Sequence, residues 1–168
     1  MSSPTPDTGR GKGPQDVRTP AALINVLRQE FPLLGVDLAA TADNALFPEF
    51  ITPEEDTLKQ DWSSFTGPNL WGFINPEFGK FGELYAPKFF QEVHRGARFV
   101  SLTLASLEND WYSTYFHGQP CEVRILRGRL RFPGYPHSAS KGHMITVWDG
   151  QPFRAPWPWD WRSLIKKN

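Results

Sequence analysis

The fold of this chain is constrained most by one short apolar segment that ends abruptly in an Asn-Pro pair. Residues 70–74, Leu-Trp-Gly-Phe-Ile, are rich in aromatic and branched side chains and predict a buried β-strand. The polar turn Asn-Pro-Glu-Phe-Gly follows at once, at residues 75–79. Because open α/β sheets form their sites at the carboxyl ends of strands, this turn predicts a binding or catalytic loop.

The turn is suited to one kind of chemistry. The side-chain carbonyl of Asn75 and the backbone carbonyl of Pro76 are neighbouring hydrogen-bond acceptors. Two acceptors match an exocyclic amine, which carries two N–H donors, and the flat ring of Phe78 is suited to stack on the base that bears the amine. A base reaches such a loop only after it has left the helix stack.

The remaining segments alternate between helical and strand character. Thr19 is a suitable N-cap and Pro20 a suitable first residue for a helix that stops at Pro32. Further helices are expected at 80–96, interrupted or kinked at Pro87, and after residue 109; strands are expected at 34–38, 97–104 and 144–148, and a hairpin at 122–132. This order predicts a single α/β domain at residues 15–149, with a mostly parallel sheet flanked by helices, between a disordered arm at 1–14 and a Trp/Pro-rich tail at 150–168.

An ordered set of short motifs gives the chain a family resemblance. The turn at 75–78 resembles motif IV of amino-group DNA methyltransferases, and the whole set resembles the phage-type DNA N-6-adenine methyltransferase family between about Gln15 and Trp148. The other segments that carry the resemblance are Thr19-Pro20, Val36–Ala40, Asn44–Leu46, Asp56, Asp61-Trp62, Trp111 and Arg127–Phe132.

The resemblance implies a Rossmann-like fold that transfers a methyl group from S-adenosylmethionine to the N-6 amine of adenine in DNA. The implied catalytic residues are Asn75, Pro76 and Phe78. The implied cofactor contacts are Thr19, Pro20, Asp37, Ala39, Asp56 and Asn75, and the implied DNA contacts are Glu77, Phe78, Lys80, Trp111, Arg129 and Arg131. Without the resemblance, structural interpretations stay open: capping for Thr19 and Asp37, solvent exposure for Asp56 and core packing for Trp111.

Glu77 is the main departure from the family pattern, which generally has Pro at this position. A glutamate makes the loop more flexible and adds a negative charge beside the base and the sulfonium. A second hypothesis is therefore a catalytically degenerate methyltransferase fold that serves as a DNA- or protein-binding module.

Composition narrows the class of protein. The formal net charge is zero, with eighteen basic and eighteen acidic residues, which does not favour strong binding to nucleic acid except through a local cluster such as the arginines at 124–131. The single cysteine excludes an internal disulfide and is typical of a reducing cytosol, and the resemblance implies a bacterial or phage-infected host cytoplasm. Histidine and cysteine spacings predict no metal site, and no apolar run approaches the ~18 residues of a membrane span.

The tail is unusual because prolines alternate with large rings. The prolines at 152, 156 and 158 are interleaved with Phe153, Trp157, Trp159 and Trp161. We expect this segment to resist regular structure and to pack back over the domain, with a protein partner or stacked bases as alternatives, since a free row of tryptophans would promote aggregation.

Overall fold

A seven-stranded mixed sheet forms the centre of the molecule. The computed structural model describes residues 18–166, so the arm predicted at 1–14 lies outside the described residues. The strands are arranged in the order β2-β1-β3-β4-β6-β5-β7. Their bounds are β1 Leu34–Asp37, β2 Glu49–Phe50, β3 Trp71–Ile74, β4 Phe99–Leu104, β5 Cys121–Leu126, β6 His143–Trp148 and β7 Arg154–Trp159.

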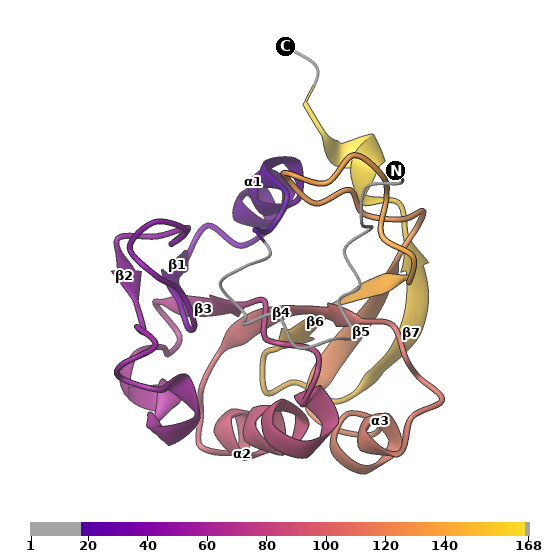
Figure 1. Ribbon diagram of the computed structural model, residues 1–168. Coiled ribbons are helices and arrows are strands. Elements are labelled where there is room, and N and C mark those ends of the chain that lie inside the picture. The colour runs from indigo at the N-terminus through magenta and orange to yellow at the C-terminus, as the bar shows by residue number, and fades with distance from the viewer. Residues whose placement is uncertain (1–17, 167–168) are drawn as a thin grey trace.

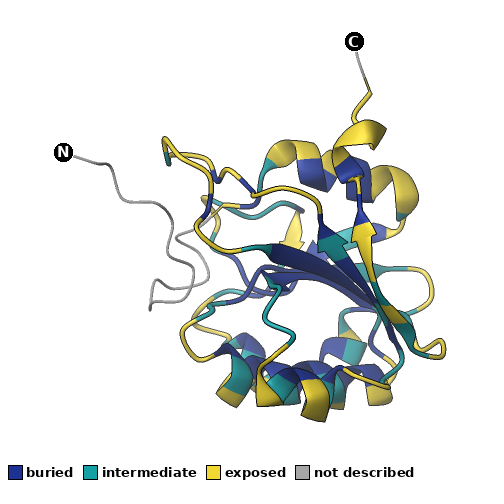
Figure 2. Ribbon diagram, turned by 90° about the vertical axis from the view of Figure 1, so that its right-hand side faces the viewer, coloured by how far each residue is buried: buried dark blue, intermediate teal, exposed yellow. Residues whose placement is uncertain are grey.

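Helices cover both faces of this sheet (Figure 1). The helix α2 (Ala86–His94) and α3 (Asp110–Tyr115) pack on one face, and α1 (Ala21–Glu30) lies on the other beside the short turn η4 (Trp161–Leu164). Two 3-10 turns, η1 (Thr57–Lys59) and η2 (Trp62–Ser64), and a π-helical turn, η3 (Phe81–Tyr85), complete the described elements. The buried residues of the helices face the sheet, which is itself almost fully buried at its centre (Figure 2).

Strand direction sets the edge at which a site can form. The neighbouring pairs β2-β1, β1-β3, β3-β4 and β5-β7 are parallel, and β6 runs opposite to β4 and β5. The carboxyl ends of β1, β3, β4, β5 and β7 therefore meet at one edge of the sheet, which we call the carboxyl edge. This architecture confirms the predicted α/β class with a mostly parallel sheet.

Rings dominate the core between the sheet and α2. Trp62, Phe89, Phe99 and Trp148 are fully buried, and Phe99 stacks on Trp148 with ring centroids 5.6 Å apart. Trp62 meets Phe99 edge to face at 5.2 Å. Trp62 thus anchors the acidic segment before β3 in the core.

Two local predictions were wrong. The helix α1 begins at Ala21 with Pro20 as its cap residue, so Thr19 is not the N-cap. Residues 129–132 form no strand, and β5 pairs with β6 and β7 instead. The expected interruption of the helical segment near Pro87 is confirmed: the π-helical turn ends at Tyr85 and α2 begins at Ala86, so Pro87 lies in the first turn of a new helix, where a missing N–H costs nothing.

The Trp/Pro-rich tail also differs from expectation, because it forms the edge strand β7. Trp157 and Trp159 pair with Arg124 and Leu126 of β5, and the carbonyl of Trp159 accepts the N–H of Arg127. The prolines occupy the alternate positions, whose backbone nitrogens point away from β5, so no ladder hydrogen bond is lost. Trp159 is buried, which confirms that this part of the tail packs back on the domain.

Candidate active site at the carboxyl edge

The Asn-Pro turn lies at the carboxyl edge, directly after β3. The neighbouring strand β1 ends in Asp37, which is in register with Phe73 of β3. Parallel pairing therefore brings Asp37 beside Asn75, although the two residues are 38 positions apart in the sequence. Asn75 and Pro76 are both buried, and Glu77 and Phe78 are half-buried.

Four of the expected cofactor residues surround one small cavity of about 20 Å³. They are Thr19, Asp37, Ala39 and Asn75, and the lining is completed by Arg18, Asn44, Leu46 and Phe73. Thr19 does not cap a helix; its hydroxyl accepts a hydrogen bond of 3.2 Å from Nδ2 of Asn75. This bond joins the segment before α1 to the Asn-Pro turn. Because the cavity has room for about one water molecule, a nucleoside can enter only if the lining separates.

Asp37 has the electrostatic character of a cation site. Its side chain is 5 % exposed, and its two oxygens accept the N–H groups of Ala39 and Leu46, each at 3.3 Å. Burial raises the pKa of Asp37 to about 7, against the lowering effect of these two hydrogen bonds. A buried carboxylate is stabilised by a positive charge, so this corner fits an ammonium group.

A second cavity, of about 530 Å³, opens on the other side of the same turn. It is bounded by the loops that follow β3 and β4, and three expected DNA contacts, Phe78, Lys80 and Trp111, line it together with Phe81, Gly82, Glu83, Ser106, Asn109 and Asp110. Its volume lies within the range of small-molecule sites, about 300–1,000 Å³. Asn75 therefore faces the small cavity, and Phe78, three residues later, faces the large one.

Close packing fixes the wall of the large cavity. The ring of Trp111 meets Phe81 edge to face at 4.8 Å and lies directly against Gly82. A Cβ atom on Gly82 would come within 2.5 Å of Cδ1 of Trp111, which explains why this position has no side chain. Trp111 thus has both a packing contact and a surface that lines the cavity.

Sequence reasoning missed His143, which lies behind Phe78. The two rings meet edge to face at 5.9 Å, and His143 also meets Phe132 at 5.2 Å. His143 is fully buried, and burial lowers its pKa to about 4, against the raising effect of a hydrogen bond with the backbone of Lys141. A neutral imidazole therefore supports Phe78 as a packing ring, and no local pattern in the sequence distinguishes it from an ordinary strand residue.

Asp56 and Glu77 line neither cavity, and both act on the hydroxyl of Tyr85. Asp56 begins η1 with a positive φ of 55°, and its carboxylate accepts the N–H of Leu58 at 3.2 Å. Burial, together with the charges of Glu77 and Asp56, raises the pKa of Tyr85 to about 12. The structure therefore does not bring Asp56 to the cavity of Asp37.

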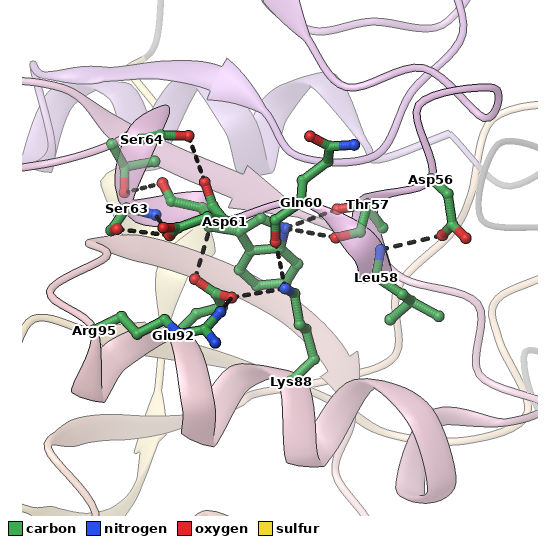
Figure 3. Close-up of polar contacts among 12 residues, drawn as sticks. Asp56, Thr57, Leu58, Gln60, Asp61, Ser63, Ser64, Lys88, Glu92 and Arg95 are labelled. Carbon is green, nitrogen blue, oxygen red and sulfur yellow. Dashed lines mark hydrogen bonds and ion pairs between the residues drawn. The ribbon is translucent and has the colours of Figure 1, made fainter.

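A buried ion pair holds the segment that contains Asp56 (Figure 3). Lys88 of α2 donates to the carbonyl of Gln60 and pairs with Glu92 at 2.6 Å, and the other oxygen of Glu92 accepts the N–H of Trp62 at 3.0 Å. Lys88 and Glu92 are 6 % and 0 % exposed. This network fixes η1 and η2 against α2 and so sets the position of Asp56.

Arg129 and Arg131 belong to the long loop at 127–142, which leaves the carboxyl edge after β5. Both side chains are exposed, and neither lines the two cavities. Arg129 lies over Gly142, next to His143, and Arg131 donates to the carbonyl of Tyr135 at 3.4 Å. In contrast, Arg124 is buried and bidentate on Glu30, so it is not part of an exposed basic face.

Other site types are not found among residues 18–166. No group of three histidine, cysteine, aspartate or glutamate side chains in this range is arranged to hold a metal ion. No helix within the same range has the length and apolar character needed to cross a membrane.

Comparison with known proteins identifies a family. A family model described as DNA N-6-adenine-methyltransferase (Dam) matches residues 10–156. The comparison with curated proteins gave no match.

Proposed function

Because the chain belongs to the DNA N-6-adenine-methyltransferase family, we propose that its Asn-Pro turn performs the reaction of that family at the carboxyl edge. The family methylates the N-6 amine of adenine in DNA and uses S-adenosylmethionine as the donor. Membership confirms the predicted family, fold class and enzyme class. The roles of individual residues are our proposal.

The observation that carries the proposal is the position of one short turn between two cavities. Asn75 lines the small cavity with Asp37, and Phe78 lines the large one with Trp111. Methyl transfer needs a donor and an acceptor on either side of one reacting centre, held in line. A turn that faces both cavities is suited to hold the two substrates together.

The small cavity is the proposed entry to the cofactor site. Asp37 would accept the ammonium group of the methionine portion, Ala39 would allow close approach, and Thr19 with Pro20 would line the same portion. Asp56 would lie toward the adenine portion. When bound, S-adenosylmethionine supplies an electrophilic methyl group on a sulfonium centre. Since the present cavity is small, binding would break the hydrogen bond between Thr19 and Asn75.

The Asn-Pro turn is the proposed amine site. The adenine amine is a poor nucleophile because its lone pair is delocalised into the ring. Carbonyl oxygens of Asn75 and Pro76 would accept its two N–H groups and favour a pyramidal nitrogen, whose lone pair is then directed at the methyl group. Fixed acceptors of this kind act by electrostatic stabilisation and positioning.

The large cavity is the proposed site of the flipped base. Phe78 would stack on the base, a contact worth about 1–3 kcal/mol, against the backing of His143. Trp111 and Lys80 would bound the base and its sugar-phosphate. Glu77 adds a negative charge near the sulfonium, and Arg129 and Arg131 would contact DNA phosphates.

Methyl transfer to adenine-containing DNA tests this assignment. With tritiated cofactor and a duplex pool of random sequence, we expect Asn75→Ala to lower kcat by about 10²–10³-fold, as removal of one preorganised polar group does. Asn69→Ala, at an exposed asparagine before β3, should keep the wild-type rate. Wild-type turnover by Asn75→Ala would overturn the proposal, and cofactor binding without any transfer would favour the degenerate binding module.

A further inference from the structure

We propose that the C-terminal turn after β7 holds the arginine-bearing segment 127–131 in position as a surface for the DNA backbone. We call residues 127–131 the arginine segment. The proposal rests on the proposed function for its choice of partner. The C-terminal residues involved, 157–166, lie beyond the part of the chain that matches the family model.

The clamp is formed by one arginine of η4. Arg162 donates from Nη1 to the carbonyl of Arg127 at 2.7 Å and from Nη2 to the carbonyl of Arg129 at 2.9 Å. Its guanidinium lies 4.7 Å from the ring centroid of Trp161, which is 4 % exposed and fixed in the core. A planar guanidinium with a fixed fork of donors is preorganised to bridge two carbonyls in this way, whereas a lysine ammonium lacks the fork.

The backbone between the two carbonyls is shaped to receive this guanidinium. Gly128 has a φ of +74°, and a Cβ atom there would lie 2.9 Å from Nη1 of Arg162. The preceding residue is tied to β7, because Arg127 donates its N–H to the carbonyl of Trp159 at 3.1 Å. The arginine segment and the C-terminal turn therefore lie side by side, as the orange and yellow segments of Figure 1 do.

The result is an exposed positive surface at the carboxyl edge. Arg127, Arg129 and Arg131 are exposed, and Arg162 adds its charge. The one acid paired with them among residues 18–166 is Asp160, 3.3 Å from Arg127, and both partners are more than half exposed, so this pair is weak. A cluster with this excess of positive charge fits a polyanion.

The surface also continues toward the proposed base site. Arg129 lies over Gly142, and the next residue, His143, contacts the ring of Phe78. A DNA strand whose base occupies the large cavity would then bring its neighbouring phosphates to the arginine segment. Each phosphate contact to duplex DNA contributes about 0.9 to the slope of log affinity against log salt.

Two glycine variants test the clamp without changing any charge. Gly128→Ala should displace Arg162, whereas Gly134→Ala, at a glycine of φ +84° with no atom near the new Cβ, is the matched control for backbone strain. By anisotropy of a labelled duplex at several salt concentrations, we expect Gly128→Ala to weaken binding about tenfold and reduce the salt slope by about 1, and Gly134→Ala to stay within about twofold of wild type.

Arginine variants separate clamping from direct phosphate contact. Arg162→Ala and Arg162→Lys should both reproduce the loss, since lysine restores the charge but not the fixed fork that bridges the two carbonyls. Arg154→Gln, at the opposite end of β7, should bind DNA as wild type does. Full binding by Gly128→Ala, or rescue by Arg162→Lys, would overturn the clamp, and full binding by an Arg129→Gln/Arg131→Gln double variant would overturn the surface.

The readouts keep this proposal distinct from the proposed function. Cofactor affinity is measured by calorimetry for every variant and should match wild type for Arg162→Ala, and thermal melting shows that each variant is folded. If the wild-type protein shows no methyl transfer, the proposed function is wrong, but the differences in DNA affinity between variants can still be interpreted. Equal DNA affinity in all variants, with methyl transfer intact, would defeat the clamp alone.

Discussion

Replacing Asp37 by asparagine should make the protein more stable and impair its binding of cofactor. The carboxyl is 5 % exposed, and burial raises its pKa from the ordinary 3.8 to about 7. A gap of roughly three pH units corresponds to about 4 kcal/mol by which the folded state disfavours the carboxylate. Asparagine removes this cost but supplies one acceptor fewer for the two N–H groups, so we expect a net gain of about 2–3 kcal/mol at pH 8.

The sign of the pH dependence follows from the same shift. Between pH 3.8 and about 7 the folded protein keeps a proton on Asp37 that the unfolded chain has lost. The free energy of unfolding therefore falls as pH rises through this window, and the full cost is present above it. Urea denaturation from pH 4 to 8 should show this fall in the free energy of unfolding for the wild type and for an Asp43→Asn control. It should be absent from Asp37→Asn.

Cofactor binding should depend on pH in the opposite sense. An ammonium group beside Asp37 lowers the pKa of the carboxyl, so binding releases a proton below pH 7. Affinity for S-adenosylhomocysteine should then rise by up to about tenfold per pH unit from pH 5.5 toward 7, a range in which an α-amino group stays charged. Calorimetry in two buffers of different ionisation enthalpy measures the released proton.

We expect Asp37→Asn to be a stable variant with weakened cofactor binding. Asp37→Asn should bind at least about tenfold more weakly at pH 7, with no pH dependence from this residue. If Asp37→Asn is less stable than wild type at pH 8 and retains the affinity for cofactor, Asp37 is a structural cap and the reasoning fails.

Three further predictions concern the supports of the site. Glu92→Gln should lower the free energy of unfolding by about 3 kcal/mol in urea denaturation, because it leaves Lys88 buried without its counter-charge; an unchanged midpoint would contradict this. Gly82→Ala should displace Trp111 and raise the KM for DNA several-fold, with cofactor affinity unchanged. If DNA KM and cofactor affinity change equally, the large cavity is not a separate DNA site. His143 has a folded pKa of about 4 against an ordinary 6.5, so the wild type should lose up to about 3 kcal/mol as pH falls between these values, and His143→Phe should lack that loss in acid denaturation.

Local patterns in the sequence predicted the part of the site that lies on adjacent strands. The apolar run before Asn75 and the carboxylate that ends β1 are each visible within a few residues, and parallel pairing brings them together without further information. The mostly parallel sheet followed from the same alternation of elements. The chemistry of the turn could be inferred because its acceptors and its ring are consecutive in the chain.

The remaining features depend on contacts between distant segments. Thr19 was expected to cap α1, but its hydroxyl meets Asn75, 56 positions later, and nothing local distinguishes the two roles. The tail was expected to be irregular because of its prolines, yet an edge strand tolerates proline wherever the backbone nitrogen points outward. His143 shows the same limit, since its contact with Phe78 exists only after β6 has paired with β4.

The most direct test of the account is a crystal structure of the protein with S-adenosylhomocysteine. We predict that the amino group of the ligand lies within hydrogen-bond distance of Asp37, that Thr19 and Asn75 have separated to admit it, and that its sulfur faces the turn at 75–78. Ligand density at any other edge of the sheet, or a bound ligand with Asp37 still enclosed by its two backbone donors, would contradict the account.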